Sequence, residues 1–185
     1  REIRQRVDDI AHPYQMGSWL YTFHAFGLRV LREHIEALNL GYNRYFTVID
    51  EEDARRVVRD VLNDLNLDVK SYPVRMVRSI LSDYKMELIQ FSDIAYHNIY
   101  DRYQEYLRKE QLMDFDDLLV NTYTLLKENK EVREKYQNKF EHILIDEFQD
   151  TDKIQYEIIK ILSEKHKNTF VVGDPDQSIY AFRGA

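Results

Sequence analysis

The 185-residue sequence contains no cysteine. A disulfide bond, a thiolate nucleophile and a cysteine-ligated zinc site are therefore all excluded. The sequence also lacks any apolar run near the roughly 20 residues that a membrane-spanning helix needs, and it does not open on a signal peptide. We therefore expect no association with a membrane, and a soluble protein of the cytoplasm.

Glycine and proline are scarce, at 5 and 3 residues, while 44% of the residues are hydrophobic and 32% are charged. This balance is typical of a folded, helix-rich protein and excludes a disordered one. The length suits one domain, or a domain with an insertion. The net charge of −7 argues mildly against nucleic-acid binding, because such domains are usually basic, but a net charge does not describe any single face.

Two short apolar runs in the C-terminal part stop abruptly on carboxylates. The run Ile143–Ile145 ends at Asp146-Glu147, and the run 170–172 ends at Gly173-Asp174. Continuous apolar runs of this length predict strands that are buried on both faces of a parallel sheet. Because ligands of open α/β sheets bind beyond the carboxyl ends of the strands, we expect both acidic clusters to face one crevice.

The chemistry that suits this placement is phosphoryl transfer from a nucleotide. An aspartate at a strand end can help to hold Mg²⁺, and a neighbouring carboxylate can orient or deprotonate the attacking water. We assign the magnesium role to Asp146 and the base role to Glu147, and both carboxylates are candidate metal ligands. The alternative is that both residues merely end a strand and that Asp150 or Thr151 caps the helix predicted over 153–162.

Amphipathic helices dominate the middle of the chain. Apolar spacing predicts one helix capped by Asp50, one with Pro73 in its first turn and one capped by Ser92, with no strand signal between residues 50 and 112. Basic residues on these helices could meet duplex phosphates or could form a solvated face: Arg55, Arg56, Arg59, Arg75, Arg78 and Lys85.

The flanking segments mix helices with one aromatic strand. Helical spacing is present over 1–11, an aromatic-rich strand is predicted over 19–23, and a helix is predicted to begin at His24. A helix over 114–126 is expected to turn Phe115 inward together with its leucines. Its first turn carries three aspartates, which the helix dipole alone would favour: Asp114, Asp116 and Asp117.

Four segments together resemble motifs of the UvrD/PcrA/Rep-type superfamily 1 DNA helicases. They occur in the family's order and read TFHAF (22–26), MDFDDLL (113–119), DEFQDT (146–151) and GDPDQSIYAFRGA (173–185). The resemblance covers nearly the whole chain. It implies a partial RecA-like α/β domain of the P-loop NTPase type, ATP and Mg²⁺ as cofactors, and single-stranded DNA and single/double-strand junctions as partners.

The resemblance also implies roles for individual residues. Gln177 is expected to sense the terminal phosphate of the nucleotide. The path of single-stranded DNA is expected to be lined by Thr22, Phe23 and His24. Its bases are expected to stack on Tyr180 and Phe182. The alternative is structural, with Phe23 in the core, His24 capping a helix, and Tyr180 and Phe182 packed against the sheet.

The helical segment is expected to interrupt the α/β domain. We assign residues 1–37 and 113–185 to the RecA-like parallel sheet and its helices, with motifs II and III in the second part. Residues 38–112 are assigned to an all-helical accessory subdomain, which the family carries between these motifs.

No pair among the 5 glycines fits the phosphate-binding loop GxxxxGK[ST]. The family places that loop before residue 1 and a second RecA-like domain after residue 185, so we expect an interior fragment that alone does not turn over ATP at a useful rate. For its parent we expect ATP-dependent DNA unwinding with 3′ to 5′ translocation in repair or replication. The parent is expected to be a monomer at the bacterial nucleoid, with repair or replication proteins as possible partners.

Two other functions compete with this interpretation. The first is a non-catalytic DNA-binding or protein-interaction module that is derived from such a helicase. The second is a magnesium-dependent phosphohydrolase that uses the carboxylates directly. It would need more acidic ligands at other strand ends, and Asp174 is the one well-placed candidate.

Overall fold

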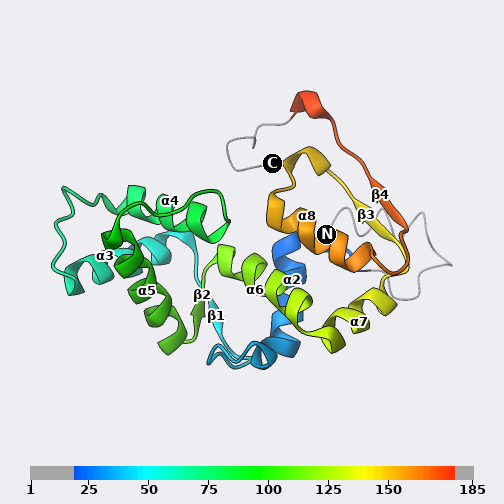
Figure 1. The fold of residues 1–185 in the computed structure, drawn as a ribbon, viewed down its shortest axis with the longest axis horizontal. Helices are drawn as coiled ribbons and strands as arrows, with labels where there is room; N and C mark the ends of the chain where they lie inside the picture. Colours follow the sequence, from blue (N-terminus) through cyan, green and yellow to red (C-terminus); the bar gives the residue numbers. More distant parts are fainter. Residues whose placement is uncertain (1–18, 178–185) are drawn as a thin grey trace.

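The computed structural model describes residues 19–177, which form a mostly helical α/β structure with short parallel strands. A helical lobe contains α3 (Glu51–Asp64), α4 (Val74–Lys85) and α5 (Ile94–Lys109). A strand lobe contains α2 (Phe23–His34), α6 (Phe115–Glu128), α7 (Lys130–Lys139), α8 (Lys153–Ser163), β3 (Ile143–Ile145) and β4 (Thr169–Val171). The helical lobe meets the strand lobe at the start of α6 (Figure 1). None of the helices within residues 19–177 has the length and apolarity that a bilayer crossing requires.

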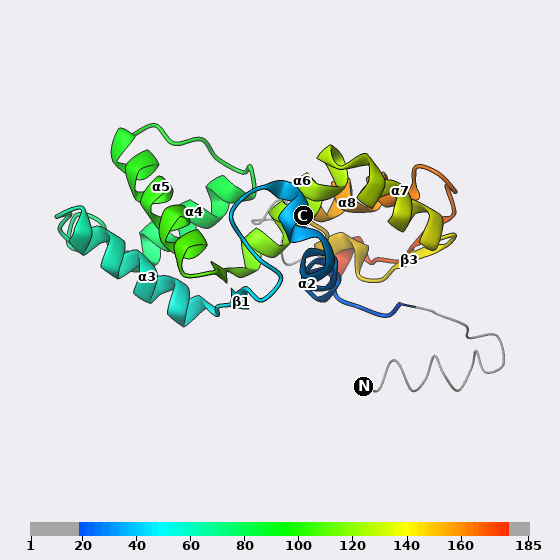
Figure 2. The same cartoon turned by 90° about the horizontal axis from the view of Figure 1, so that it is seen from below.

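The core of the strand lobe forms where α2, α6 and α8 pack together. Their buried apolar side chains include Val30, Leu31, Leu118, Leu119, Leu125, Leu126, Ile154, Ile158 and Leu162. α2 approaches α6 closely at Gly27, where a Cβ atom would lie 2.8 Å from Thr122 Oγ1 and 2.9 Å from the carbonyl oxygen of Leu118. A larger side chain at this position would push the two helices apart. Figure 2 shows α6 and α2 lying between the helical lobe and the helices α7 and α8.

The helical lobe has its own core, built from α3, α4 and α5. Its buried side chains include Val57, Val58, Val61, Leu62, Val77, Leu81, Ile99, Tyr103 and Leu107. As predicted, the Asp50 carboxylate caps α3, accepting the Asp53 N–H at 2.9 Å. Asp93 caps α5 and accepts the Ala95 N–H at 2.9 Å, so the prediction of a Ser92 cap is wrong by one residue. Pro73 directly precedes α4.

A short parallel bridge connects the ends of the helical segment. β1 (Thr47–Val48) pairs with β2 (Leu112–Met113). The segment 38–112 therefore contains strand residues and is not all-helical. Two-residue strands are too short to produce the alternating pattern by which a strand is recognised in sequence. The domain limits at 37/38 and 112/113 stay a prediction.

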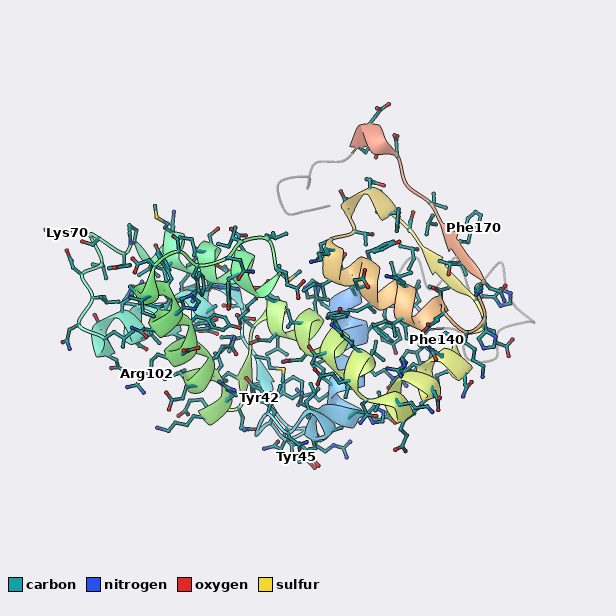
Figure 3. The ribbon with its side chains drawn as sticks, in the orientation of Figure 1. Tyr42, Tyr45, Lys70, Arg102, Phe140 and Phe170 are labelled. Carbon is teal, nitrogen blue, oxygen red and sulfur yellow. The ribbon has the colours of Figure 1, made fainter. Side chains whose placement is uncertain are left out.

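β3 and β4 pair in parallel, which confirms the predicted direction, with Ile143 opposite Thr169 and Ile145 opposite Val171. The predicted burial of both faces is wrong, because Leu144 is 74% exposed and Phe170 is 64% exposed. Figure 3 shows Phe170 extending away from the lobe. Within residues 19–177 this sheet has two strands, and all three residues of β4 are exposed.

Two predictions at helix starts are also corrected. α8 is capped by Asp152, which accepts the Gln155 N–H at 2.8 Å, so neither Asp150 nor Thr151 is its cap. Phe115 was expected inside the core and is instead 46% exposed. It is the first residue of α6, and the buried positions at that end of the helix are taken by the aspartates Asp114 and Asp117, which are 1% and 5% exposed.

A buried charge cluster joins α4 to the first turn of α6. Lys85 Nζ donates to Asp114 Oδ2 at 2.7 Å and to Asp117 Oδ1 at 2.8 Å, and Arg78 Nη2 donates to Asp116 Oδ2 at 3.0 Å. Both cations are about 95% buried, since Arg78 is 4% exposed and Lys85 is 5% exposed. For these two residues the expected duplex contact and the expected solvated face are both wrong, because the aspartates of α6 already bind the cations.

Candidate nucleotide site at the strand ends

Two exposed carboxylates follow β3 at its carboxyl end. Asp146 comes directly after Ile145, and Asp146 Oδ1 accepts the backbone N–H of Glu147 at 3.0 Å. Glu147 has a φ of 52°, in the left-handed region that non-glycine residues seldom occupy. The chain turns there into the short 3₁₀ helix η2 (Phe148–Asp150). Strained backbone of this kind is often found at functional sites, and here it places both side chains at the strand end.

Backbone pairing continues past the strands and brings the two acidic segments together. Val172 N–H donates to the carbonyl oxygen of Ile145 at 2.8 Å, and Phe148 N–H donates to the carbonyl oxygen of Val172 at 2.9 Å. As a result, the segment that follows β4 lies against the turn that follows β3. This is the side-by-side arrangement that parallel strands were expected to give the two clusters.

Gln149 connects the two acidic segments through its side chain. Its Nε2 donates to Glu147 Oε2 at 2.6 Å, and its Oε1 accepts the N–H of Asp174 at 3.0 Å. Gln149 was not predicted from the sequence as part of the site. Its only local signal is an amide placed between acidic residues, and nothing nearby in the sequence reveals a partner that lies 25 residues further along the chain.

The contact between Gln149 and the segment after β4 requires a glycine at position 173. A Cβ atom on Gly173 would lie 2.7 Å from Gln149 Oε1 and 3.1 Å from the Gln149 nitrogen. Real Cβ atoms do not approach an oxygen this closely, so any side chain here would displace the Gln149 amide. The glycine lets the β4 segment approach the Asp-Glu turn.

The remaining polar groups lie on the segment after β4. Gln177 Nε2 donates to Asp174 Oδ2 at 2.7 Å, and the Asp176 N–H donates to Asp174 Oδ1 at 3.0 Å. Both contacts lie in and beside η3 (Pro175–Gln177). Tyr180 and Phe182 lie outside the described residues.

The donor set at the strand ends fits Mg²⁺ bound together with a nucleotide. Within residues 19–177 there is no group of three or more His, Asp or Glu residues that could hold a metal by themselves. Mg²⁺ is usually held by one or two carboxylates together with water and substrate phosphates. Asp146 and Glu147 would supply two carboxylates, and the remaining ligands would have to come from the nucleotide and from water.

The segment predicted to contact DNA begins a helix. Residues 19–22 have no regular structure, so the predicted strand over 19–23 is wrong. Thr22 Oγ1 accepts the Ala25 N–H at 3.2 Å and caps α2, which begins at Phe23. The alternative in which His24 caps the helix is therefore also wrong. A threonine cap stops the extended segment from continuing as a strand.

Phe23 and His24 have different surroundings. Phe23 is half-buried against the core of the strand lobe. The His24 ring meets the exposed Phe115 ring edge-on, with centroids 5.7 Å apart. Burial lowers the pKa of His24, while the charges of Asp116 and Asp152 oppose this effect. Because Asp152 caps α8, the helix that follows the Asp-Glu turn, the start of α2 lies near the start of α8.

Residues 1–185 match the family model described as the UvrD/REP helicase N-terminal domain. The chain is 41% identical to the ATP-dependent DNA helicase PcrA of Staphylococcus aureus strain Mu50. It is 40% identical to the proteins of the same name from Bacillus subtilis strain 168 and Staphylococcus epidermidis. Each comparison covers 100% of this chain and 26% of the relative, so the chain spans about a quarter of the length of these proteins.

Proposed function

We propose that this chain, which belongs to the UvrD/REP helicase N-terminal domain family, contributes the catalytic carboxylates of an ATP-dependent DNA helicase. The observation that carries the proposal is the pair Asp146 and Glu147 at the end of a parallel strand, linked by Gln149 to the segment after β4. Because the chain spans 26% of the length of its relatives, the activity is proposed for the full-length protein that contains it, here called the parent.

Glu147 is the proposed general base. Gln149 Nε2 donates to one of its carboxylate oxygens at 2.6 Å, which fixes the orientation of the group. The second oxygen takes no part in that bond and would accept a proton from the attacking water. A carboxylate held in this way needs little reorganisation when the water is deprotonated.

Asp146 is the proposed magnesium residue, with Glu147 beside it as a second oxygen donor. These two carboxylates would hold Mg²⁺, which would supply positive charge to offset the charge that develops on the phosphate. Asp146 Oδ1 is oriented by the Glu147 N–H, so the two carboxylates keep a fixed relation to each other. Gln177 is proposed to sense the terminal phosphate, and its contact with Asp174 holds it at the carboxyl end of β4.

The proposed DNA contacts begin with Thr22, Phe23 and His24 at the start of α2. Phe115 is added to them because its ring is exposed and meets the His24 ring. Stacking of a base on an exposed aromatic ring is worth about 1–3 kcal/mol. Tyr180 and Phe182 are proposed as further stacking residues.

We also propose a substrate, a direction of movement and a location for the parent. We place it on single-stranded DNA and on single/double-strand junctions, moving 3′ to 5′ as a monomer in repair or replication. Its relatives are bacterial helicases, and we place it at the nucleoid in the cytoplasm. Residues 1–185 alone are proposed to lack useful ATP turnover, because they contain no GxxxxGK[ST] loop to cradle the phosphates.

The test is ATP hydrolysis by the parent, measured with and without single-stranded DNA. We expect DNA to stimulate the rate, and we expect residues 1–185 alone to show no turnover under either condition. A parent that binds DNA but hydrolyses no ATP in its presence would contradict the motor and support the non-catalytic binding module.

Gly173→Ala in the parent is expected to lower the DNA-stimulated hydrolysis rate by about 10-fold, as loss of an orienting contact typically does. The new Cβ would lie 2.7 Å from Gln149 Oε1, so the amide that orients Glu147 must move. The measurement is the steady-state rate at saturating ATP and DNA.

Gln149→Ala provides the matched comparison for this variant. It removes the same contact directly, so its loss of rate should be similar, and the double variant should be little worse than either single one. Independent, multiplying losses would show that Gly173 acts by some route other than Gln149.

A further inference from the structure

Arg78 connects the helical lobe to the start of α6. Its Nη2 donates to Asp116 Oδ2 at 3.0 Å and lies 3.6 Å from Asp114 Oδ2, while its Nε lies 3.2 Å from Glu51 Oε2 on α3. The Arg78 side chain is 5% exposed, and Asp114 and Asp116 are 1% and 18% exposed, so its contacts with the two aspartates form in a largely water-free setting. Charge pairs in such a setting are screened far less than pairs on the surface.

Asp116 lies between Arg78 and the start of α2. Its side chain is 18% exposed, and together with Asp152 it is one of two carboxylates whose charge acts on His24. The preceding residue, Phe115, meets the His24 ring at 5.7 Å. The turn of α6 that Arg78 binds is therefore the same turn that faces His24.

An unneutralised Asp116 carboxylate would oppose DNA at this surface. It would repel a phosphate group that approaches His24, since DNA binding depends on cations facing the phosphates. It could also turn towards His24 and compete for its ring nitrogens. The Arg78 guanidinium prevents both effects by binding Asp116 from the side of the helical lobe.

We propose that Arg78 is a positioning residue of the DNA contact surface, acting through Asp116. It neutralises that carboxylate and fixes the first turn of α6. As a result, the rings of Phe115 and His24 face the single-stranded DNA together. The inference rests on the proposed function, because it takes His24 to contact DNA. It assigns the helical lobe a direct part in forming that surface.

The experiment measures binding of a fluorescently labelled oligothymidine to the parent, without nucleotide, by fluorescence anisotropy. Arg78→Met is expected to weaken binding by about 10-fold. Adding Asp116→Asn to that variant is expected to restore the affinity to within about twofold of wild type, because the substitution removes the unneutralised carboxylate charge. The matched control is Arg55→Met, since Arg55 also pairs with Glu51, at 3.2 Å, but lies on an exposed face of α3. Its affinity should equal that of wild type.

Each other outcome overturns the inference. If Arg78 only stabilises the fold, the double variant will bind no better than Arg78→Met. If Arg78→Met does not fold, Asp116→Asn alone decides: the inference requires binding at least as tight as wild type, and a loss of about 10-fold refutes it. A wild-type parent that fails to bind the oligonucleotide refutes the proposed function as well, whereas wild-type binding with no effect of Arg78→Met refutes the inference alone.

Discussion

Glu147→Gln in the parent is expected to lower the DNA-stimulated rate of ATP hydrolysis by about 10²–10⁴-fold, the usual contribution of general acid–base catalysis. The substitution keeps the size of the side chain and an oxygen that can accept the Gln149 Nε2 hydrogen bond. It removes the carboxylate, and an amide oxygen does not take up a proton near neutral pH. The measurement is the steady-state rate at saturating ATP and DNA, together with nucleotide affinity by titration calorimetry.

Nucleotide affinity separates this role from a role in binding. If Glu147 acts as the base, the variant loses rate while it still binds the nucleotide with an affinity close to that of wild type. The matched control is Glu141→Gln, which makes the same chemical change at an exposed glutamate before the other end of β3. That control should keep the full rate. A Glu147→Gln variant with more than about a tenth of the wild-type rate would exclude Glu147 as the base.

The sequence could predict this site because its main elements are encoded locally. An apolar run that stops on Asp146 and Glu147 identifies both the strand and its end, and parallel pairing with the run at 170–172 follows from their common character. The structure confirms the pairing of β3 and β4. It does not confirm their burial, because burial depends on what covers a strand and not on the strand's own residues.

Contacts between distant segments could not be predicted in the same way. Gln149 reaches Asp174 across 25 residues, and Arg78 reaches Asp116 across 38. Arg78 lies on the buried face of α4 with Val77 and Leu81, but helical periodicity identifies only the face and not the distant partner of a charge on it. The three aspartates at the start of α6 were explained by the helix dipole for the same reason, and their cationic partners became visible only in the fold.

Lys85→Met is expected to lower the free energy of opening of α4 and α6 by about 3–5 kcal/mol, the usual cost of removing one partner of a buried ion pair. Lys85 is 5% exposed and binds Asp114 and Asp117 at 2.7 and 2.8 Å. Burial lowers the pKa of Lys85, but the two carboxylates outweigh it and keep the amine protonated. Native-state hydrogen exchange of the parent measures the opening free energy of the amides in both helices.

Lys153→Met is the matched control for this substitution. Lys153 also bridges the two lobes, with its Nζ 2.8 Å from Glu87 Oε2, but its side chain is 56% exposed. An exposed pair of this kind contributes little to stability, because water screens it. The contrast between the two lysines therefore tests burial, with the substitution and the bridging geometry held constant. Equal effects would show that the charge cluster is not what joins the lobes.

Asp117→Asn, added to Lys85→Met, shows how much of the lost free energy of opening comes from the unpaired charge of Asp117. Burial, together with the nearby charge of Asp114, raises the pKa of Asp117 to about 6, so its ionised form is held at a cost that Lys85 offsets. Once Lys85 is replaced by methionine, that offset is lost, and replacing Asp117 by asparagine should recover part of the stability. The double variant is therefore expected to open less readily than Lys85→Met alone. If the double variant has a lower free energy of opening than Lys85→Met, the stability is lost through packing contacts, and the charge of the Asp117 carboxylate is not the cause.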